Sequence, residues 1–251
     1  MPAMTVPALP DETFRRVLCV VAHPDDMEYG VSAAVAKWTS QGIEVAYLLL
    51  TRGEAGMPNP PEETARLRVA EQRAACDAVG VDQLTVLEHP DGVLVYGLDL
   101  RRDICREIRR FMPDVVFGSA FDVETGFGFD QADHRAAGLA TLDAIRDAGN
   151  RWVFPEQVTG EGLEPHSPRW YLQPGFRNAT HGVDVTGEPL RRGVASLEAH
   201  AGYLAALPDH PAPAELIPQF AAMSGKPLGV EHAVLFRAHD LQAPPDFDAV
   251  D

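Results

Sequence analysis

The chain has 251 residues, of which 45% are hydrophobic and 23% charged, a composition typical of a globular protein with a substantial core. Its 37 acidic residues outnumber 21 basic ones, and the net charge of −16 argues against nucleic acid and anionic lipid surfaces as partners. The N-terminus has no basic region followed by an apolar stretch, and no apolar run approaches the roughly 20 residues of a membrane span. We therefore expect a soluble, cytoplasmic protein.

The first 150 residues alternate predicted strands with predicted helices. Continuous apolar runs, typical of buried strands in a parallel sheet, lie at 15–22, 44–51, 83–89 and 114–120. Helical spacing of apolar residues, mostly ended by Gly or Pro, predicts helices at 27–41, 63–79, 98–112 and 134–148. This order predicts an α/β fold, a Rossmann-like doubly wound and mainly parallel sheet.

The remaining hundred residues are less regular and predict a C-terminal strand and helix extension. The segment "HGVDVT" at 181–186 is expected to form a strand, and the apolar spacing over 188–207 predicts a helix. No repeat and no long linker divides the chain. We therefore expect a single domain over 1–251 that ends in a C-terminal tail at 224–251.

The stretch "VVAHPDDMEYG" at 20–30 places His23, Asp25 and Asp26 directly after the first predicted strand. Ligands of open α/β sheets bind at the carboxyl ends of strands. Pro24 stiffens the turn there by restricting its own backbone and that of His23. One Asp at such a turn is well explained as a helix cap, but two beside a His are not. Since a divalent cation would offset the repulsion between the carboxylates, the stretch favours a metal site.

A catalytic zinc usually has three protein ligands, and it binds imidazole nitrogen and carboxylate oxygen. The first strand supplies His23 and one Asp, so the third ligand should come from the carboxyl end of another strand. The loop after the fourth predicted strand ends in "DQADH", where His134 opens the next helix. We therefore predict a metal site of His23, Asp26 and His134. Three other histidines are candidates for the surrounding pocket: His89, His181 and His200.

The segment "AHPDDMEYG" resembles the A-H-P-D-D-x-E signature of the PIG-L/LmbE-like family of metal-dependent N-acetylglucosaminyl deacetylases. That family includes enzymes that deacetylate the sugar precursors of mycothiol and bacillithiol. Further segments are similar to later parts of the family: "TRGEAG", "RVAEQRAACDAVGV", "HPDG", "PDVVF", "DVT" and "LEAHAGYL". The resemblance covers about residues 15–206.

The resemblance implies a role for each matching position near the first strand. His23, Asp26 and His134 match the metal ligands of the family, in agreement with the site predicted from the residues. Asp25 matches the general base that activates the water at the metal.

The resemblance also implies substrate contacts. Arg68 matches an arginine that contacts the substrate, and Asp91 matches a carboxylate near the sugar. The loop 52–60, which begins with Arg52, would hold the same substrate. Without the family, a solvated helix face would explain Arg68 and a simple turn would explain Asp91.

One position departs from the family pattern. The family often has H-P-D-H before its last ligand, where the first His is the proposed acid or oxyanion partner, and this chain has Gln131 there in "QADH". Glutamine can donate a hydrogen bond to an oxyanion, but it cannot deliver a proton at neutral pH. The proton for the leaving group would then come from Asp25, from water at the metal, or from His181 or His200.

The sequence therefore predicts a zinc-dependent hydrolase that removes the N-acetyl or N-acyl group from a small N-acetylglucosamine-containing molecule, with other divalent metals such as Fe²⁺ as alternatives. An amidase acting on a mycothiol-type conjugate and a non-catalytic metal-binding relative are the competing hypotheses. A nucleotide-binding protein is disfavoured, because no GxGxxG follows the first strand. The expected partner is the amino-sugar conjugate, and a homo-oligomer remains compatible with the sequence.

Overall fold

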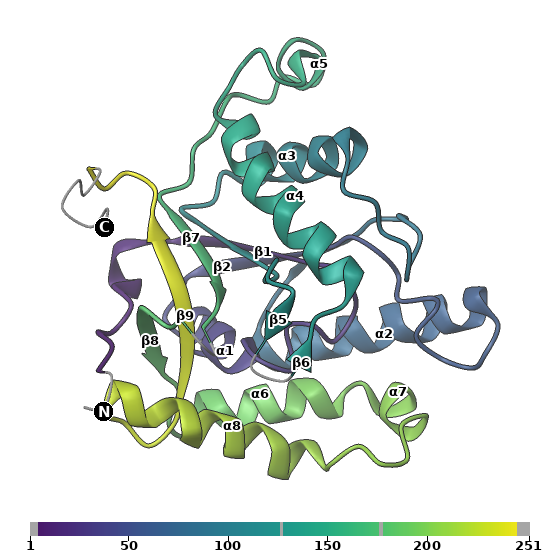
Figure 1. Ribbon diagram of the computed structural model, residues 1–251, viewed down its shortest axis with the longest axis vertical. Coiled ribbons are helices and arrows are strands. Elements are labelled where there is room, and N and C mark those ends of the chain that lie inside the picture. The colour runs from purple at the N-terminus through teal and green to yellow at the C-terminus, as the bar shows by residue number, and fades with distance from the viewer. Residues whose placement is uncertain (1–4, 126–127, 176–177, 245–251) are drawn as a thin grey trace.

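The computed structural model describes residues 5–125, 128–175 and 178–244, and its centre is a seven-stranded sheet (Figure 1). In chain order, its strands are β1 Arg16–Val21, β2 Glu44–Leu49, β3 Gln83–Val86, β4 Val115–Gly118, β7 Trp170–Pro174, β8 His181–Asp184 and β9 Ala233–Asp240. Across the sheet the order is β3-β2-β1-β4-β7-β9-β8. The five strands from β3 to β7 pair in parallel, and β9 runs antiparallel to both of its neighbours. A small hairpin of β5 Glu124–Thr125 and β6 Gly128–Phe129 stands apart.

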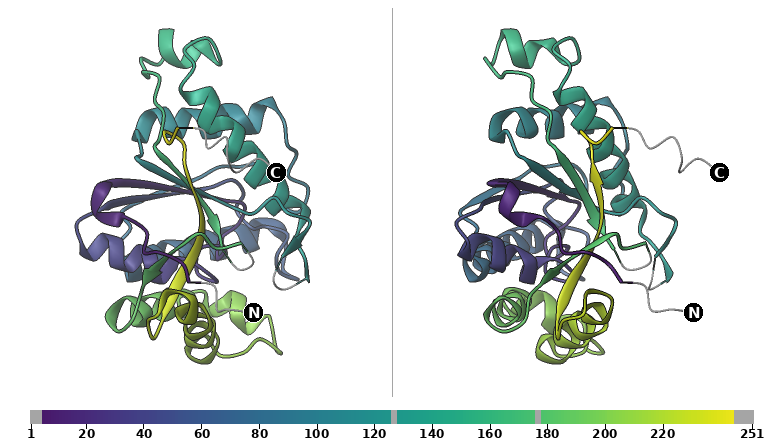
Figure 2. Two further views of the ribbon diagram at one scale, coloured as in Figure 1. Left: turned by 60° about the vertical axis from the view of Figure 1, so that its left-hand side comes forward. Right: turned by 90° about the vertical axis from the view of Figure 1, so that its left-hand side faces the viewer.

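Helices cover both faces of the sheet (Figures 1 and 2). They are α1 Ser32–Ser40, α2 Pro61–Val79, α3 Leu98–Phe111, α4 Ala132–Ala148, α5 Pro155–Thr159, α6 Glu188–Glu198, α7 Ala201–Ala205 and α8 Pro213–Leu228. Alternate residues of β1 face opposite layers: Leu18 and Val20 pack with α3 and α4, whereas Val17 and Cys19 pack with α1, α6 and α8. The predicted doubly wound, mainly parallel α/β fold is therefore confirmed.

The first predicted helix begins later than the sequence pattern indicated. The pattern predicted a helix over 27–41, but α1 starts at Ser32. Asp25 has a φ of +82°, in the left-handed region that few residues other than glycine adopt. The N–H groups of Glu28 and Tyr29 donate to the carbonyl of Asp25. The segment 25–31 is therefore wound into turns that keep its acidic side chains at the end of β1.

The predicted helix over 188–207 is two helices, with a break at Ala199 and His200. The carboxylate of Glu71, on α2, accepts hydrogen bonds from the N–H groups of Gly202 at 2.5 Å and Tyr203 at 3.3 Å. This long-range cap satisfies donors at the start of α7. Glu71 and Gly202 are 131 positions apart along the chain, so the local spacing of apolar residues could not predict this contact or the helix break beside it.

The prediction of a tail over 224–251 is wrong for most of that range. Residues up to Leu228 complete α8, and β9 inserts between β7 and β8. Phe236 of β9 is fully buried against Trp38 of α1. Burial of that ring stabilises the element far more than local propensity does. Residues 245–251 of the predicted tail lie outside the described residues.

The topology brings the predicted site together, because β1 and β4 are neighbours in the sheet. The loops that follow these two strands therefore meet at the carboxyl edge, the usual ligand position in such sheets.

None of the helices in the described part of the chain is long and apolar enough to cross a membrane.

Candidate metal centre

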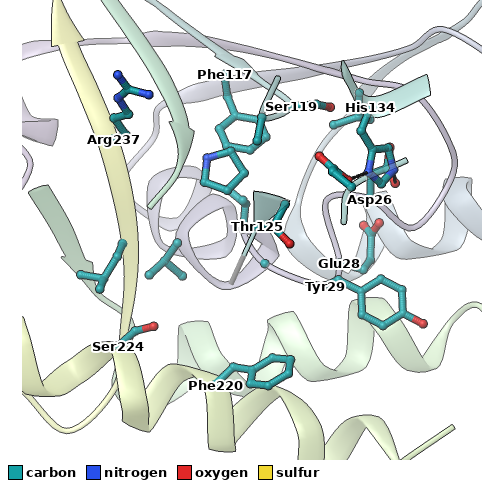
Figure 3. Close-up of a pocket in the computed structure, with 18 of the residues that line it drawn as sticks. Asp26, Glu28, Tyr29, Phe117, Ser119, Thr125, His134, Phe220, Ser224 and Arg237 are labelled. Carbon is teal, nitrogen blue, oxygen red and sulfur yellow. Dashed lines mark hydrogen bonds and ion pairs between the residues drawn. The ribbon is translucent and has the colours of Figure 1, made fainter. Parts of the chain in front are cut away.

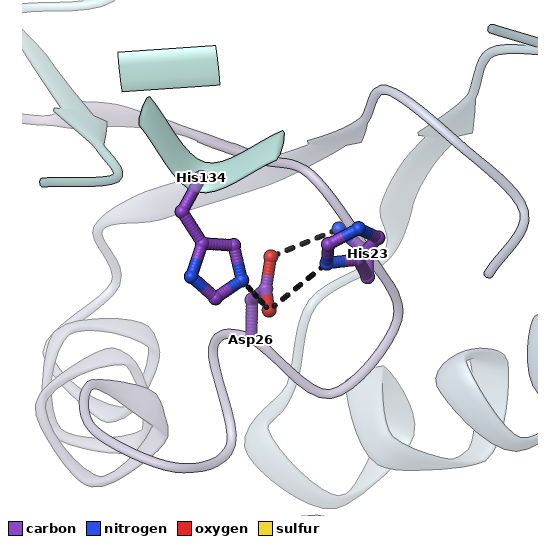
Figure 4. Close-up of side chains that lie close together, drawn as sticks. All are labelled: His23, Asp26 and His134. Carbon is purple, nitrogen blue, oxygen red and sulfur yellow. Dashed lines mark hydrogen bonds and ion pairs between the residues drawn. The ribbon is translucent and has the colours of Figure 1, made fainter. Parts of the chain in front are cut away.

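His23, Asp26 and His134 lie together at the carboxyl edge of the sheet (Figure 4). One ligand atom from each of the three lies within 4.8 Å of the other two. Oδ1 of Asp26 is 3.1 Å from Nε2 of His134 and 3.6 Å from Nδ1 of His23, and Oδ2 accepts a 2.9 Å hydrogen bond from the backbone N–H of His23. Two imidazoles and one carboxylate are the donor set that suits a catalytic divalent metal. The predicted ligands therefore fit a metal ion.

A second carboxylate holds the outer nitrogen of each histidine. Nδ1 of His134 lies 2.8 Å from Oδ1 of Asp130, and Nε2 of His23 lies 3.0 Å from Oδ1 of Asp91. Such carboxylate partners fix the orientation of ligand histidines and increase their basicity. The inner nitrogens of both rings are thereby turned toward Asp26.

The electrostatics of the three residues follow from these pairs. Burial opposes the charged imidazolium, but Asp26 and Asp91 outweigh it and raise the pKa of His23 to about 11. In the same way Asp26 and Asp130 raise the pKa of His134 to about 10. Burial opposes the charged form of Asp26 too, and the two histidines hold its pKa well below the ordinary value. A metal ion binding here must displace protons from both rings.

His23, Asp91 and Asp133 form another group, in which one possible ligand atom of each residue lies within 4.8 Å of the other two. The oxygens of Asp133 already accept hydrogen bonds from the backbone N–H groups of Gly92 at 2.8 Å and Leu94 at 3.1 Å. Asp91 likewise accepts from the N–H of Ala55 at 2.7 Å. Because their oxygens are satisfied by backbone donors and by one edge of His23, these two carboxylates fit the role of supports for a ligand better than that of ligands.

Asp25 precedes the ligand Asp26 in the chain, and its side chain pairs with Arg68. Its Oδ1 is 2.9 Å from Nη2 of Arg68, and its side chain is 7% exposed. Burial raises the pKa of Asp25 to about 7, although Arg68 opposes the rise. A carboxyl group that titrates near neutral pH can both take and return a proton. This position is compatible with the base implied by the resemblance.

Arg68 is buried, which neither its expected substrate contact nor a solvated helix face would require. Besides Asp25 it binds the carbonyl of Pro24, and its guanidinium stacks on the ring of Tyr203 at 4.1 Å. A Cβ atom at Gly53 would lie 2.7 Å from Nη1 of Arg68, so the glycine of "TRGEAG" leaves room for this side chain. Arg68 therefore fixes the turn that carries Asp25.

Asp91 and Arg52 make contacts within the protein, and their expected substrate contacts stay predictions. Asp91 is turned toward His23 with a buried side chain, in a position that can support a metal ligand. Arg52 extends toward the carboxylates of Glu62 and Glu88, at 3.6 and 4.0 Å. Neither residue lines the cavity described below.

His181 and His200 do not reach the ligand group. His181, on β8, contacts Thr180 and the ring of Trp170. His200 is fully buried, and its Nε2 lies 3.6 Å from Oε2 of Glu28. Neither lines the cavity that Asp26 and His134 line, and the proton-donor role considered for each stays a prediction. His89 pairs with Asp103 instead.

Gln131 occupies the N-cap position of α4, three residues before His134, but its side chain makes no capping hydrogen bond. It lines the same cavity as Asp26 and His134.

Asp130 and Glu28 were not among the site residues predicted from the sequence. The spacing of four residues between Asp130 and His134 is a usable signal at a helix N-terminus. Oε1 of Glu28 accepts hydrogen bonds from Ser32, Gln72 and Ser196 and so joins three helices behind the site.

Comparisons with known proteins support the family suggested by the sequence. The family model described as GlcNAc-PI de-N-acetylase, PIG-L, matches residues 18–145, more than half of the chain. A diacetylchitobiose deacetylase from Thermococcus kodakarensis is 32% identical over 162 residues, which are 63% of this chain and 59% of the relative. A 1D-myo-inositol 2-acetamido-2-deoxy-alpha-D-glucopyranoside deacetylase from Kineococcus radiotolerans is 30% identical over 218 residues, 70% of this chain and 58% of that protein. The chain thus spans less than two thirds of the length of these relatives.

Among solved structures, the N,N'-diacetylchitobiose deacetylase from Pyrococcus horikoshii is similar to this chain, with a TM-score of 0.82. The superposition covers 95% of this chain and 90% of that structure, at 22% sequence identity. At this identity the likeness concerns the fold, and it includes the sheet and helices that carry the candidate site.

Proposed function

Since the chain belongs to the GlcNAc-PI de-N-acetylase family, PIG-L, we propose that it is a metal-dependent hydrolase of the N-acyl group on a small amino-sugar conjugate. The observation that carries the proposal is the arrangement of His23 and His134, each held by a carboxylate on its outer nitrogen and turned toward Asp26 on its inner one. Zinc is the proposed metal, with Fe²⁺ as the alternative.

The proposed reaction is amide hydrolysis: water adds to the carbonyl carbon, the C–N bond breaks, and a carboxylic acid and a free amine are released. A divalent cation held by His23, Asp26 and His134 would polarise the carbonyl and make the attacking water more acidic. Asp25 takes the proton of the water and returns it to the leaving nitrogen, because a carboxyl group with a pKa of about 7 is present in both forms near neutral pH. The amide N–H of Gln131 donates a hydrogen bond to the developing oxyanion.

Metal content and amine release test the proposal together. The purified protein should contain about one divalent ion per chain, and chelation should abolish the release of acetate and the appearance of the free amine on N-acetylglucosamine conjugates. His134→Ala should lose both metal and turnover. The matched control is His181→Ala, since that ring lies on β8 away from the ligand group.

Full turnover by a metal-free His134→Ala protein would refute the metal site. Release of amine from simple peptides but from no glycoside in a varied panel would refute the substrate class. Release only from S-conjugates of the mycothiol type would favour the amidase alternative.

A further inference from the structure

A cavity of about 690 Å³ opens beside the ligand group (Figure 3). Asp26 and His134 line it at one end, and Arg237 of β9 and Ser224 of α8 lie at the other. Its volume falls within the range of about 300–1,000 Å³ that is common for small-molecule sites. An acetyl group would fill only a small part of it.

Between these ends, the cavity is walled largely by the hydrophobic core. Val31, Phe117, Ile217, Ala221 and Val234 all line it, and all belong to the buried cluster between the sheet and helices α1, α6 and α8. Such walls offer no hydrogen-bond partners to sugar hydroxyl groups, which are costly to bury without them. They do favour a flexible apolar chain, because each methylene group that is transferred from water to the cavity makes the binding free energy more favourable.

Polar side chains such as Ser119, Asp122 and Asn178 also line the cavity, but a separate set of charged groups lies on the other side of the ligand group. The outer nitrogen of His23 faces Asp91, which also binds the loop 52–60 through the N–H of Ala55. Among the described residues, those that line the cavity include neither Asp91 nor any residue of 52–60. The two sides of a scissile amide held at the metal centre would therefore meet different surroundings. The sugar side fits the loop with its charged groups, and the acyl side fits the apolar cavity.

We infer that this cavity binds the acyl chain of the substrate and that the preferred acyl group is an apolar chain longer than acetyl. The inference rests on the proposed function and narrows its substrate class to N-acyl amino sugars with chains of medium length. Hydrolysis of such a substrate releases the free fatty acid and the amino sugar.

A chain-length series tests this inference directly. Glucosamine carrying N-acetyl, N-butanoyl, N-hexanoyl or N-octanoyl groups is incubated with the metal-loaded enzyme, and kcat/KM is measured from the release of glucosamine. Burying one more methylene is worth up to about fourfold in kcat/KM, so hexanoyl should exceed acetyl by at least about tenfold. A value that is flat or falls from acetyl to octanoyl overturns the inference while leaving the hydrolase intact.

Ala221→Phe places a ring in the cavity, and Ala222→Phe is its matched control, because Ala222 is the exposed neighbour on the same helix. The ratio of octanoyl to acetyl kcat/KM should fall at least about tenfold in the first variant and stay unchanged in the second. If Ala221→Phe does not fold, Ala221→Leu provides the same comparison with less added volume. Equal ratios in the folded cavity variant and the control contradict the inference.

Two further measurements separate the remaining outcomes. Octyl N-acetylglucosaminide carries its chain on the anomeric oxygen. A higher kcat/KM for this compound than for the methyl glycoside, lost in Ala221→Phe, would assign the cavity to the aglycone and reject the acyl assignment.

Calorimetry with octanoate tests binding in the cavity without turnover. Octanoate binding that Ala221→Phe weakens, in a protein that hydrolyses no amide, would retain the apolar site and refute the proposed function. Absence of both binding and chain-length preference would reject the site.

Discussion

Nε2 of His23 lies 3.0 Å from Oδ1 of Asp91, and the Asp91 side chain is 5% exposed. This pair joins the turn after β3 to the end of β1, and it points Nδ1 of His23 toward Asp26. The hydrogen bond to His23 holds the pKa of Asp91 below its usual value, although burial opposes this. Asp91 is therefore an ionised partner of the imidazole, as a support for a metal ligand should be.

Asp91→Asn should accordingly lower metal affinity by about 10–100-fold, because an amide orients the ring less firmly and makes it less basic. Competition with a chromophoric chelator measures this. Asp99→Asn, at an exposed site on α3, should leave the affinity unchanged. Normal metal affinity together with a raised KM in Asp91→Asn would instead support the sugar contact that the resemblance implies for Asp91.

Asp25 and Asp26 should differ by experiment although they are neighbours. Asp25→Asn should keep its metal and lose at least about 10²-fold in kcat, because the proposed general base is removed. Asp26→Asn should lose metal, since its carboxylate faces both histidines. Metal analysis beside steady-state kinetics distinguishes the two, and equal metal loss in both variants would mean that the roles are wrongly divided.

Arg68 should set the pH dependence of the reaction through Asp25. The guanidinium lowers the pKa of Asp25 against the effect of burial, so its removal raises that pKa further. Since the base works in its ionised form, the acidic limb of kcat/KM should move to higher pH in Arg68→Met. The control is Arg66→Met, on the exposed face of the same helix. A raised KM with an unmoved limb would argue for a direct substrate contact.

The sequence predicted that His23, Asp26 and His134 lie together, because their positions depend on neighbouring strands. His23 and Asp26 follow β1 directly, and His134 lies in the first turn of the helix after β4. The neighbouring positions of β1 and β4 follow from the common topology of such sheets. The supporting carboxylates depend on side-chain direction in the folded state. Asp91 in the turn after β3 and Asp133 in the first turn of α4 converge on His23, a meeting that no local pattern encodes.

The C-terminal region shows the same limit for the fold. Helix α8 contains Pro218 and Pro227, which disfavour a helix by local propensity. It forms nonetheless, because Ile217 and Ala221 pack into the main core beside β9. Tertiary packing overrides propensity there, so a tail was predicted where the structure has part of a helix and a strand.

Arg109 is a buried cation outside the site, and its removal should cause a large loss of folding stability. It is 1% exposed and donates to five backbone carbonyls between residues 147 and 154 and to the side chain of Gln157. Arg109→Met leaves these buried acceptors without a donor and should destabilise the protein by more than about 3 kcal/mol. Arg110→Met, at the exposed neighbour paired with Glu107, should cost less than about 1 kcal/mol. Chemical denaturation measures both, and similar losses would contradict this account.

Gln131 should contribute to the rate without contributing a titrating group. Its side chain is not used in capping α4 and lies on the cavity that Asp26 and His134 line. Gln131→Ala should therefore lower kcat by up to about 10²–10³-fold, the range for a lost oxyanion donor, and the basic limb of the pH–rate profile should stay in place. Gln131→His introduces an imidazole and should move that limb. His200→Gln should leave the limb unmoved, because its ring is buried against Glu28 away from the cavity. A basic limb that disappears in His200→Gln while Gln131→Ala retains full kcat would transfer the proton-donor role to His200 and remove it from Asp25.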